Sequence, residues 1–322
     1  MEETLLIILL SFVGLMMMNP ALALDYPNRH IRLVVPWPPG GGIDITARAI
    51  SPKLTENLGQ SVIIDNRPGA AGMIGTDAAA RAAPDGYTLI LGAAGPHAIL
   101  PLLNPKCPYG LKEFDEVIHF ADTFYVMVVN PSLPINTVEQ LIQAAKLKPG
   151  ELTIGSSGSA TPAFISGELF RVRSGVNLNP VFYKGAGTPV LEVMAGQISM
   201  TIETISPILP YVQSKKLRAL AMTASQRSNQ IPTVPTFAES GFPGFEVVNW
   251  YGILVPAKTP STIIQRLNKE LTSLIKIPEV HDRLVGFGLE VFTSTAEEFT
   301  KFRKLDMVKW AKIIKDINLQ YQ

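Results

Sequence analysis

Cysteine and histidine are scarce in this chain. Cys107 is the only cysteine in 322 residues, which excludes an intramolecular disulfide and a zinc site built on cysteines. The four histidines stand far apart, and no two of them have the i, i+4 spacing that places two metal ligands on one helix face. We therefore expect no metal site, and we interpret Cys107 as a small packed or loop residue.

An excess of positive charge is also lacking. The chain has 28 Lys and Arg against 27 Asp and Glu, a net charge of +1 at pH 7. This balance does not supply the basic surface that nucleic-acid binding requires, so we expect no nucleic-acid partner. Any anion that the protein binds must be held by local groups.

A segment long enough to span a bilayer is lacking as well. The apolar run at residues 5–18 is shorter than a membrane span, and Ala21 and Ala23 follow it at the two positions that a signal peptidase reads. We predict that residues 1–23 are a signal peptide cleaved after Ala23, and that the mature protein is periplasmic. Glu2 and Glu3 stand where a signal usually has basic residues. An atypical signal, a different start codon or a buried N-terminal helix are the alternatives.

The rest of the chain alternates short β-rich runs with helical patterns. It is 47% hydrophobic, enough for a sizeable core, and its length favours two domains. Such alternation is typical of α/β folds with largely parallel sheets covered by helices on both faces. We expect strands at residues 31–35, 62–66, 88–92, 125–130, 153–156, 179–183, 200–202, 219–222 and 252–255.

Helix signals are clear at three places. The spacing of apolar residues predicts a helix at residues 137–147. Thr259 as N-cap and Pro260 as first helical residue predict the start of a second helix. Thr295, followed three residues later by Glu298, predicts a capping box at the start of a third.

Three consecutive glycines, Gly40, Gly41 and Gly42, follow the prolines after the first expected strand. Their context, PGGGID, fits neither G-x-x-x-x-G-K-[ST] nor G-x-G-x-x-G, so we expect no nucleotide and no other cofactor. Glycines that precede a helix expose N–H groups at the positive end of its dipole, which suits a small carboxylate or phosphate. A plain strand-to-helix turn is the alternative. Pro52 lies inside the helix expected next, where it should kink that helix or end it early.

A second loop, GSSGSATP at residues 155–162, is rich in hydroxyl groups. Ser156, Ser157 and Ser159 surround Gly158, and their hydroxyls with unpaired N–H groups can hold a carboxylate without a buried cation. The alternative is a Ser/Thr N-cap for the helix that follows. The loop lacks the G-x-S-x-G spacing of a nucleophile elbow, so we assign no catalytic residue and do not expect an enzyme.

Five segments of the chain resemble one known family. They read YPNRHIRLVVPWPPGGGIDITAR, IIDNRPGAAGMIGTDAAARAAPDGYTLILG, VVNPSLPINTVEQLI, YKGAGTPVLEVMAGQI and WYGILVPAKTP, and they occur in order over about residues 26–317. The resemblance is to the solute-binding receptors of tripartite tricarboxylate transporters, often called Bug receptors. It implies an α/β, type II periplasmic-binding-protein fold with mixed, mostly parallel sheets and a ligand cleft between two lobes. Lobe 1 would hold residues 24–124 plus 252–322, and lobe 2 residues 125–251.

The resemblance also implies which residues bind the ligand. In such receptors the first glycine loop and the hydroxyl-rich loop hold a carboxylate, and two further loops complete the walls. Carried onto this sequence, the ligand-binding residues are Gly40, Gly41, Gly42, Gly95, Ser156, Ser157, Gly158, Ser159, Lys184, Gly185, Thr188 and Glu203. For Lys184 a position in solvent is the alternative. Glu203 stands where the family commonly has Asp, so its polar contact with the ligand should shift. Asp44 is interpreted as a structural residue of the helix's first turn.

The implied function is that of a receptor rather than a catalyst. It captures a small carboxylate, such as a dicarboxylate or an aromatic acid, closes over it by a hinge motion and delivers it to membrane permease subunits. The contact with the permease would be transient, and the receptor itself would be a monomer. A sensory module that presents a carboxylate to a signalling partner is the alternative, and an exported hydrolase is a minor one.

Overall fold

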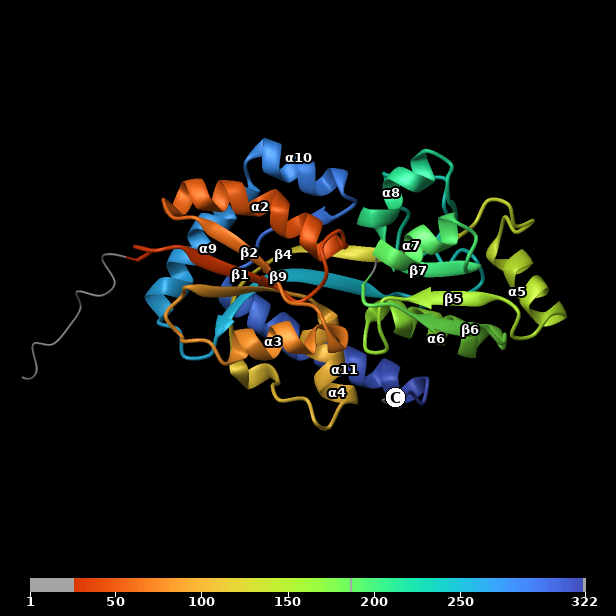
Figure 1. Cartoon of the computed structure of the whole chain (residues 1–322), viewed down its shortest axis with the longest axis horizontal. Helices are drawn as coiled ribbons and strands as arrows, with labels where there is room; N and C mark the ends of the chain where they lie inside the picture. Colours follow the sequence, from red (N-terminus) through yellow and green to blue (C-terminus); the bar gives the residue numbers. More distant parts are fainter. Residues whose placement is uncertain (1–25, 186, 321–322) are drawn as a thin grey trace, which may run out of the picture.

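The computed structural model describes residues 26–185 and 187–320 as an elongated molecule (Figure 1). The predicted signal peptide, residues 1–23, lies outside this range. The strands are β1 (Ile31–Val35), β2 (Val62–Asn66), β3 (Thr88–Gly92), β4 (Phe114–Val129), β5 (Thr153–Ser156), β6 (Asn179–Phe182), β7 (Met200–Thr204), β8 (Arg218–Met222), β9 (Val248–Pro256) and β10 (Glu290–Val291). The α-helices are α2 (Gly42–Leu58), α3 (Met73–Ala80), α4 (Leu100–Leu103), α5 (Val138–Leu147), α6 (Pro162–Ser174), α7 (Gly187–Met194), α8 (Ile205–Gln213), α9 (Ser261–Ile275), α10 (Pro278–Gly286) and α11 (Ala296–Asp316). Shorter helical turns are η2 (Ala70–Gly72), η3 (Gly95–Ile99) and η4 (Leu111–Glu113).

The strands form one continuous mixed sheet with the order β2-β1-β3-β9-β4-β7-β5-β6, and β8 and β10 also pair with β4. Parallel pairs lie toward the two ends, where β1 pairs with β2 and β3, and β5 pairs with β6 and β7. The pairs made by β4 and β9 in the middle are antiparallel. The α/β fold is confirmed, but the centre of the sheet is less parallel than the sequence predicted.

Strand β4 connects the two halves of the sheet. Its first part, through Phe124, pairs with β9, whereas Tyr125–Val129 pairs with β7 and β8. At sixteen residues it is much longer than the strand predicted at 125–130. One half of the sheet therefore carries the N-terminal strands and the other carries β5 to β8, with β4 running through both (Figure 1).

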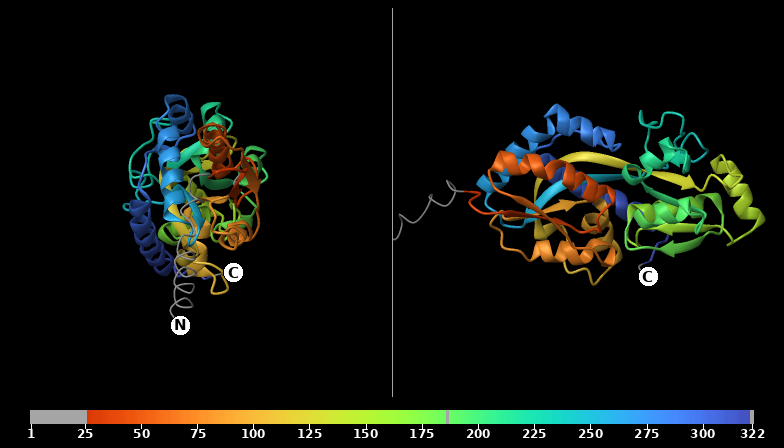
Figure 2. Two further views of the ribbon diagram at one scale, coloured as in Figure 1. Left: turned by 90° about the vertical axis from the view of Figure 1, so that its left-hand side faces the viewer. Right: turned by 45° about the horizontal axis from the view of Figure 1, so that its top comes forward.

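Helices cover both faces of the N-terminal half of the sheet (Figures 1 and 2). Ile31, Leu33 and Val35 of β1 pack in one hydrophobic cluster with residues of α2 and α9. Val34, between them, packs in the other cluster with residues of α3, α4 and α11. Because successive strand residues point to opposite faces, the apolar run of β1, interrupted only by the partly buried Arg32, fits a sheet covered on both sides.

Most predicted helix boundaries are confirmed. Helix α5 begins after its N-cap Thr137, whose hydroxyl accepts from the Gln140 amide. Helix α9 begins one residue later than predicted, because Pro260 is itself the N-cap and the Thr259 hydroxyl donates to the Pro256 carbonyl instead. Helix α2 continues through Pro52 to Leu58, so that proline does not end the helix.

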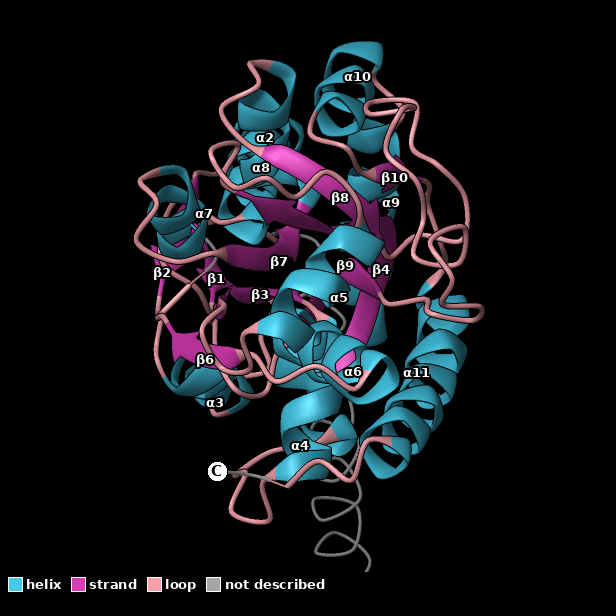
Figure 3. Ribbon diagram, turned by 90° about the vertical axis from the view of Figure 1, so that its right-hand side faces the viewer, coloured by secondary structure: helices cyan, strands magenta, loops and turns pink. Residues whose placement is uncertain are grey.

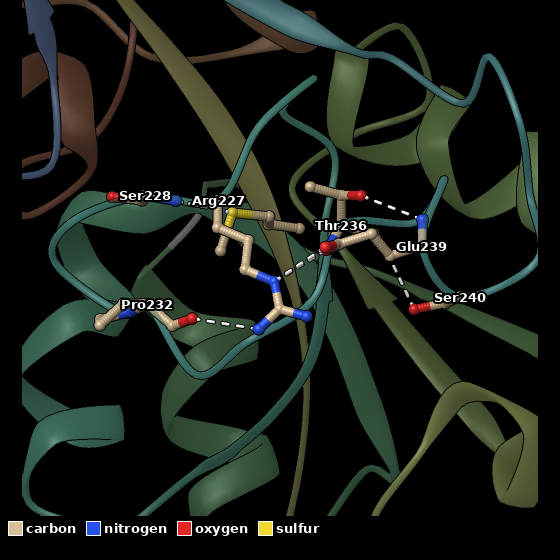
Figure 4. A network of polar contacts seen from close by, with 7 residues as sticks. Arg227, Ser228, Pro232, Thr236, Glu239 and Ser240 are labelled. Atoms are coloured by element: carbon tan, nitrogen blue, oxygen red, sulfur yellow. Dashed lines mark hydrogen bonds and ion pairs between the residues drawn. The ribbon is translucent and has the colours of Figure 1, made fainter.

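A long loop between β8 and β9 is held by a polar network (Figure 4). Arg227 Nε donates to both carboxylate oxygens of Glu239, at 3.0 and 2.9 Å, and its Nη1 donates to the Pro232 carbonyl. The Thr236 amide donates to the same carboxylate, and the Ser240 hydroxyl donates to the Thr236 carbonyl. The network fixes the loop through which the chain returns to β9.

Helix α11 lies along one side of the molecule, next to β4 (Figure 3). Its predicted capping box is confirmed: the Thr295 hydroxyl accepts from the Glu298 amide, and the Glu298 carboxylate accepts from the Thr295 amide. No helix within residues 26–185 and 187–320 has both the length and the apolar character needed to cross a bilayer.

Removal of the cap should destabilise the protein modestly. We expect Thr295→Ala to lower the free energy of unfolding by about 1 kcal/mol, the usual cost of losing an N-cap hydroxyl. Urea unfolding at pH 7 measures the change. Ser273→Ala on the exposed face of α9 is the matched control and should stay within about 0.5 kcal/mol of wild type. Equal midpoints for the two variants would show that the cap contributes nothing.

Candidate ligand-binding site

A cavity of ≈ 380 Å³ lies where the two halves of the molecule meet. One wall comes from the loops after β1 and β3, and the other from the loops after β5 and β6 and the end of β7. Strands β4 and β9 form its floor. It is lined by Trp37, Pro38, Pro39, Gly41, Gly42, Ile43, Ala93, Gly95, Pro96, Tyr125, Ser157, Thr161, Pro162, Lys184, Gly185, Gly187, Thr188, Glu203, Thr204, Asn249 and Tyr251.

Three helices begin at this cavity. Gly42 starts α2, Pro162 starts α6 and Gly187 starts α7, and all three residues line the cavity wall. The first-turn N–H groups of a helix have no partner within it, and the helix dipole places partial positive charge at that end. Convergence of three such ends gives the cavity a field that favours a small anion.

Eight of the twelve predicted ligand-binding residues line this cavity. They are Gly41, Gly42, Gly95, Ser157, Lys184, Gly185, Thr188 and Glu203. They come from five segments that are distant in sequence, and the fold brings them together. Lys184 is exposed at the cavity wall and is the only cationic side chain among the described residues that line it.

Gly40 does not line the cavity, and its amide already has a partner. The Gly40 N–H donates to Asp44 Oδ2 at 3.0 Å, and Arg48 Nε donates to the same oxygen. Asn66 Nδ2 donates to Asp44 Oδ1. Burial raises the pKa of the Asp44 carboxyl, but these hydrogen bonds outweigh it and hold the pKa below its usual range. Asp44 is thus the structural residue that the sequence predicted. Its carboxylate accepts the hydrogen bond from the Gly40 N–H that we had expected a ligand to accept.

The hydroxyl-rich loop contributes less than predicted. Ser156 does not line the cavity, and its hydroxyl donates to the Gly158 carbonyl at 3.3 Å. Gly158 and Ser159 line a neighbouring hollow, opposite the turn at 69–71. Of the three serines only Ser157 lines the cavity, beside Thr161 and Pro162 of the same loop, and its amide donates to Glu203 Oε1 at 3.0 Å. The loop therefore binds an acid of the protein itself, which sequence spacing did not indicate.

Within the described part of the chain, Glu203 is the only acidic side chain that lines the cavity, and it is 1% exposed. Burial raises the pKa of its carboxyl to about 8, although hydrogen bonds from Ser157 and the Thr204 backbone oppose that shift. The carboxyl is therefore mainly protonated at neutral pH, where an ordinary glutamate is ionised.

Gly42 marks a close approach between the two halves. A Cβ at this position would lie 2.8 Å from the Tyr251 hydroxyl and 3.0 Å from Thr204 Oγ1. The Thr204 hydroxyl is buried and has no hydrogen-bond partner among the described residues. Absence of a side chain at position 42 keeps this part of the cavity open and leaves two hydroxyls facing it.

Residues of the floor were missed by the sequence analysis. Tyr125 and Tyr251 line the cavity from β4 and β9, and burial raises the pKa of both hydroxyls. Asn249 also lines it, and its Oδ1 accepts from the Ala94 amide at 2.9 Å. A buried asparagine within the otherwise apolar run 247–255 was the available signal, because a buried polar side chain needs a nearby partner.

A second cavity, of ≈ 410 Å³, lies beside α11, and the charged side chains that line it are mostly acidic. Its lining includes Asp122, Glu246, Glu290 and Asp306 but only one cation, Lys309. Burial raises the pKa of Asp306 to about 6, and Trp250 Nε1 donates to its Oδ2. Four acids disfavour a carboxylate, so the cavity at the helix N-termini is the better anion site.

Comparison with known proteins agrees with this architecture. A family model described as tripartite tricarboxylate transporter family receptor matches residues 46–319. Protein BugT of Bordetella pertussis is 35% identical over 299 residues, which cover 92% of this chain and 92% of BugT.

Two solved structures are similar over nearly the whole chain. That of the periplasmic binding protein BugD has a TM-score of 0.88 at 28% identity and covers 92% of this chain and 100% of BugD. That of R. palustris Rpa4515 with adipate has a TM-score of 0.89 at 32% identity and covers 92% of this chain and 99% of Rpa4515. The fold is therefore that of periplasmic binding proteins, as the sequence predicted. The chain belongs to the tripartite tricarboxylate transporter receptor family, whose members are solute-binding receptors.

Proposed function

We propose that this protein is a periplasmic receptor that captures a small carboxylate in the cavity between its two halves and delivers it to membrane permease subunits. The observation that carries the proposal is the convergence of the N-termini of α2, α6 and α7 on one cavity. The cavity holds a single exposed cation, so helix ends and hydroxyls must supply most of the attraction for the anion. Adipate, the acid in the structure of Rpa4515, is a ligand of the same class.

Capture in this proposal is a hinge motion between two lobes. We assign residues 24–124 and 252–322 to lobe 1 and residues 125–251 to lobe 2. The exchange of β4 partners between Phe124 and Tyr125 supports a crossing at that point. A ligand that touches both walls favours the closed arrangement, because only that arrangement offers it both sets of contacts. Residues 1–23 would direct export and be removed, and the receptor would act as a monomer in transient contact with the permease.

A thermal-shift screen of residues 24–322 tests the proposed ligand class. A panel of dicarboxylates, monocarboxylates, aromatic acids and amino acids, adipate included, should contain a carboxylate that raises the melting temperature. Binding to the folded state alone adds about 2.7 kcal/mol of stability at a ligand concentration one hundred times the dissociation constant. A shift with amino acids and none with any organic acid would overturn the assignment.

A further inference from the structure

Glu203 is an unusual group to find in a cavity that attracts anions. It lies at the end of β7, lines the cavity and is almost fully buried. An ionised carboxylate there would repel an anionic ligand at short range, in surroundings of low dielectric constant. An anion receptor therefore either excludes its ligand from Glu203 or keeps Glu203 neutral.

The geometry supports a neutral acid with a defined orientation. The Ser157 amide donates to Glu203 Oε1, which makes this oxygen the acceptor of the carboxyl group. A proton is then best carried by the other oxygen, Oε2. The titratable groups that share the cavity are Tyr125 from β4, Tyr251 from β9 and Lys184 from the loop after β6. Both tyrosines have raised pKa values and stay neutral, and Lys184 is exposed at the wall.

We propose, building on the function proposed above, that Glu203 binds the ligand in its protonated form and donates a hydrogen bond from its carboxylic acid to the ligand's carboxylate. A carboxylic acid that donates to a carboxylate forms a short, charge-assisted hydrogen bond, stronger than one between neutral groups. Such a donor selects an organic acid at this end of the cavity. It offers no counter-charge to an ammonium group, so an amino acid that presents its ammonium here is disfavoured.

Proton linkage gives the proposal a measurable consequence. Below the pKa of the free receptor, about 8, Glu203 is protonated with and without ligand, and affinity should not change with pH. Above it the free receptor loses the proton and must regain it to bind, so affinity falls by up to about tenfold for each pH unit. Aliphatic carboxyl groups titrate at roughly pH 4 to 5, so the titration of adipate itself does not contribute above about pH 7, where the fall is expected.

The experiment is calorimetric binding of adipate between pH 6 and 9.5 with the mature protein and three variants. Should adipate not bind, the acid with the largest shift in the screen replaces it. Wild type should lose affinity above pH 8. Glu203→Gln keeps a donor that does not titrate, so its affinity should be independent of pH and within about tenfold of wild type at pH 7. Lys184→Gln and the exposed control Glu279→Gln should retain the wild-type fall.

The outcomes separate this inference from the proposed function. A wild-type affinity that is constant to pH 9.5, in protein shown to be folded by circular dichroism, would overturn the role of Glu203 and leave the carboxylate receptor standing. If Lys184→Gln loses the pH dependence, the effect belongs to that lysine, and the role of Glu203 is likewise overturned. Absence of binding by every organic acid in the screen would overturn both proposals.

Discussion

Gly42→Val should weaken carboxylate binding by about ten- to a hundredfold. The valine Cβ would lie 2.8 Å from the Tyr251 hydroxyl and 3.0 Å from Thr204 Oγ1, and Ser206 Oγ is 3.6 Å away. Residue 42 belongs to the N-terminal half of the molecule, whereas Thr204 and Ser206 belong to the other. The side chain would therefore both occupy cavity space and hold the halves apart. Overpacking costs about 1–3 kcal/mol, and each 1.4 kcal/mol is a tenfold change in affinity.

Calorimetry with the acid found in the screen measures the affinity, and urea unfolding shows whether the variant folds. Gly286→Val is the matched control, because Gly286 is exposed on α10 and a Cβ there meets no atom within 4 Å. Should Gly42→Val prove unstable, Gly42→Ala retains the clash of the Cβ with a smaller side chain. Wild-type affinity in a folded Gly42→Val variant would show that the ligand does not lie beside the start of α2.

Local sequence patterns were sufficient to predict the elements whose contacts are close in sequence. The strands predicted at 31–35, 62–66, 88–92 and 153–156 have the same bounds in the structure. Each is a short β-rich run bounded by turn residues, and such runs identify strands by themselves. The capping box at Thr295 and Glu298 is equally local, since both partners lie within one helical turn.

The prediction of the site was less complete than that of the strands, because the contacts that define the site join residues distant in sequence. The partner of the Ser157 amide is Glu203, 46 residues later, and nothing near residue 157 indicates it. Thus the loop was interpreted as a donor to a ligand rather than to an internal acid. Gly40 is a different case: Asp44 lies four residues away, at a distance where a side chain often caps the preceding turn. The hydrogen bond between them is therefore one that local sequence could indicate.

For a related reason the sequence predicted only the C-terminal part of strand β4. Residues 114–124 contain Asp115, Glu116, His119 and Asp122, which interrupt the apolar pattern of a buried strand. The structure provides Glu116 with partners from α11: the Arg303 guanidinium binds its Oε1, and the Thr300 hydroxyl donates to its Oε2 at 2.8 Å. Arg303 is 187 residues away, so periodicity within residues 114–124 could not indicate the pairing.

That pairing leads to the largest expected effect on stability. We expect Glu116→Ala to lower the free energy of unfolding by about 3–5 kcal/mol, the cost of leaving a buried charge without its partner. The Arg303 side chain is 1% exposed, and its Nε and Nη2 have no hydrogen-bond partner among the described residues. Urea unfolding at pH 7 measures the change. Glu151→Ala, which breaks an exposed pair with Lys148, is the control and should cost no more than about 1 kcal/mol.

The double variant Glu116→Leu with Arg303→Met separates the charge from the packing. If the cost comes from an unpaired guanidinium, removal of both charges should restore most of the stability, because apolar side chains of similar size often replace a buried ion pair without loss. If it comes from lost packing between α11 and β4, the double variant should be no more stable than Glu116→Ala. Carboxylate affinity should remain at the wild-type value in the folded double variant. Glu116 pairs with Leu254 of β9, nine residues before Tyr125 on β4, where the cavity begins. A fall in affinity would mean that α11 also sets the geometry of the strands under the ligand.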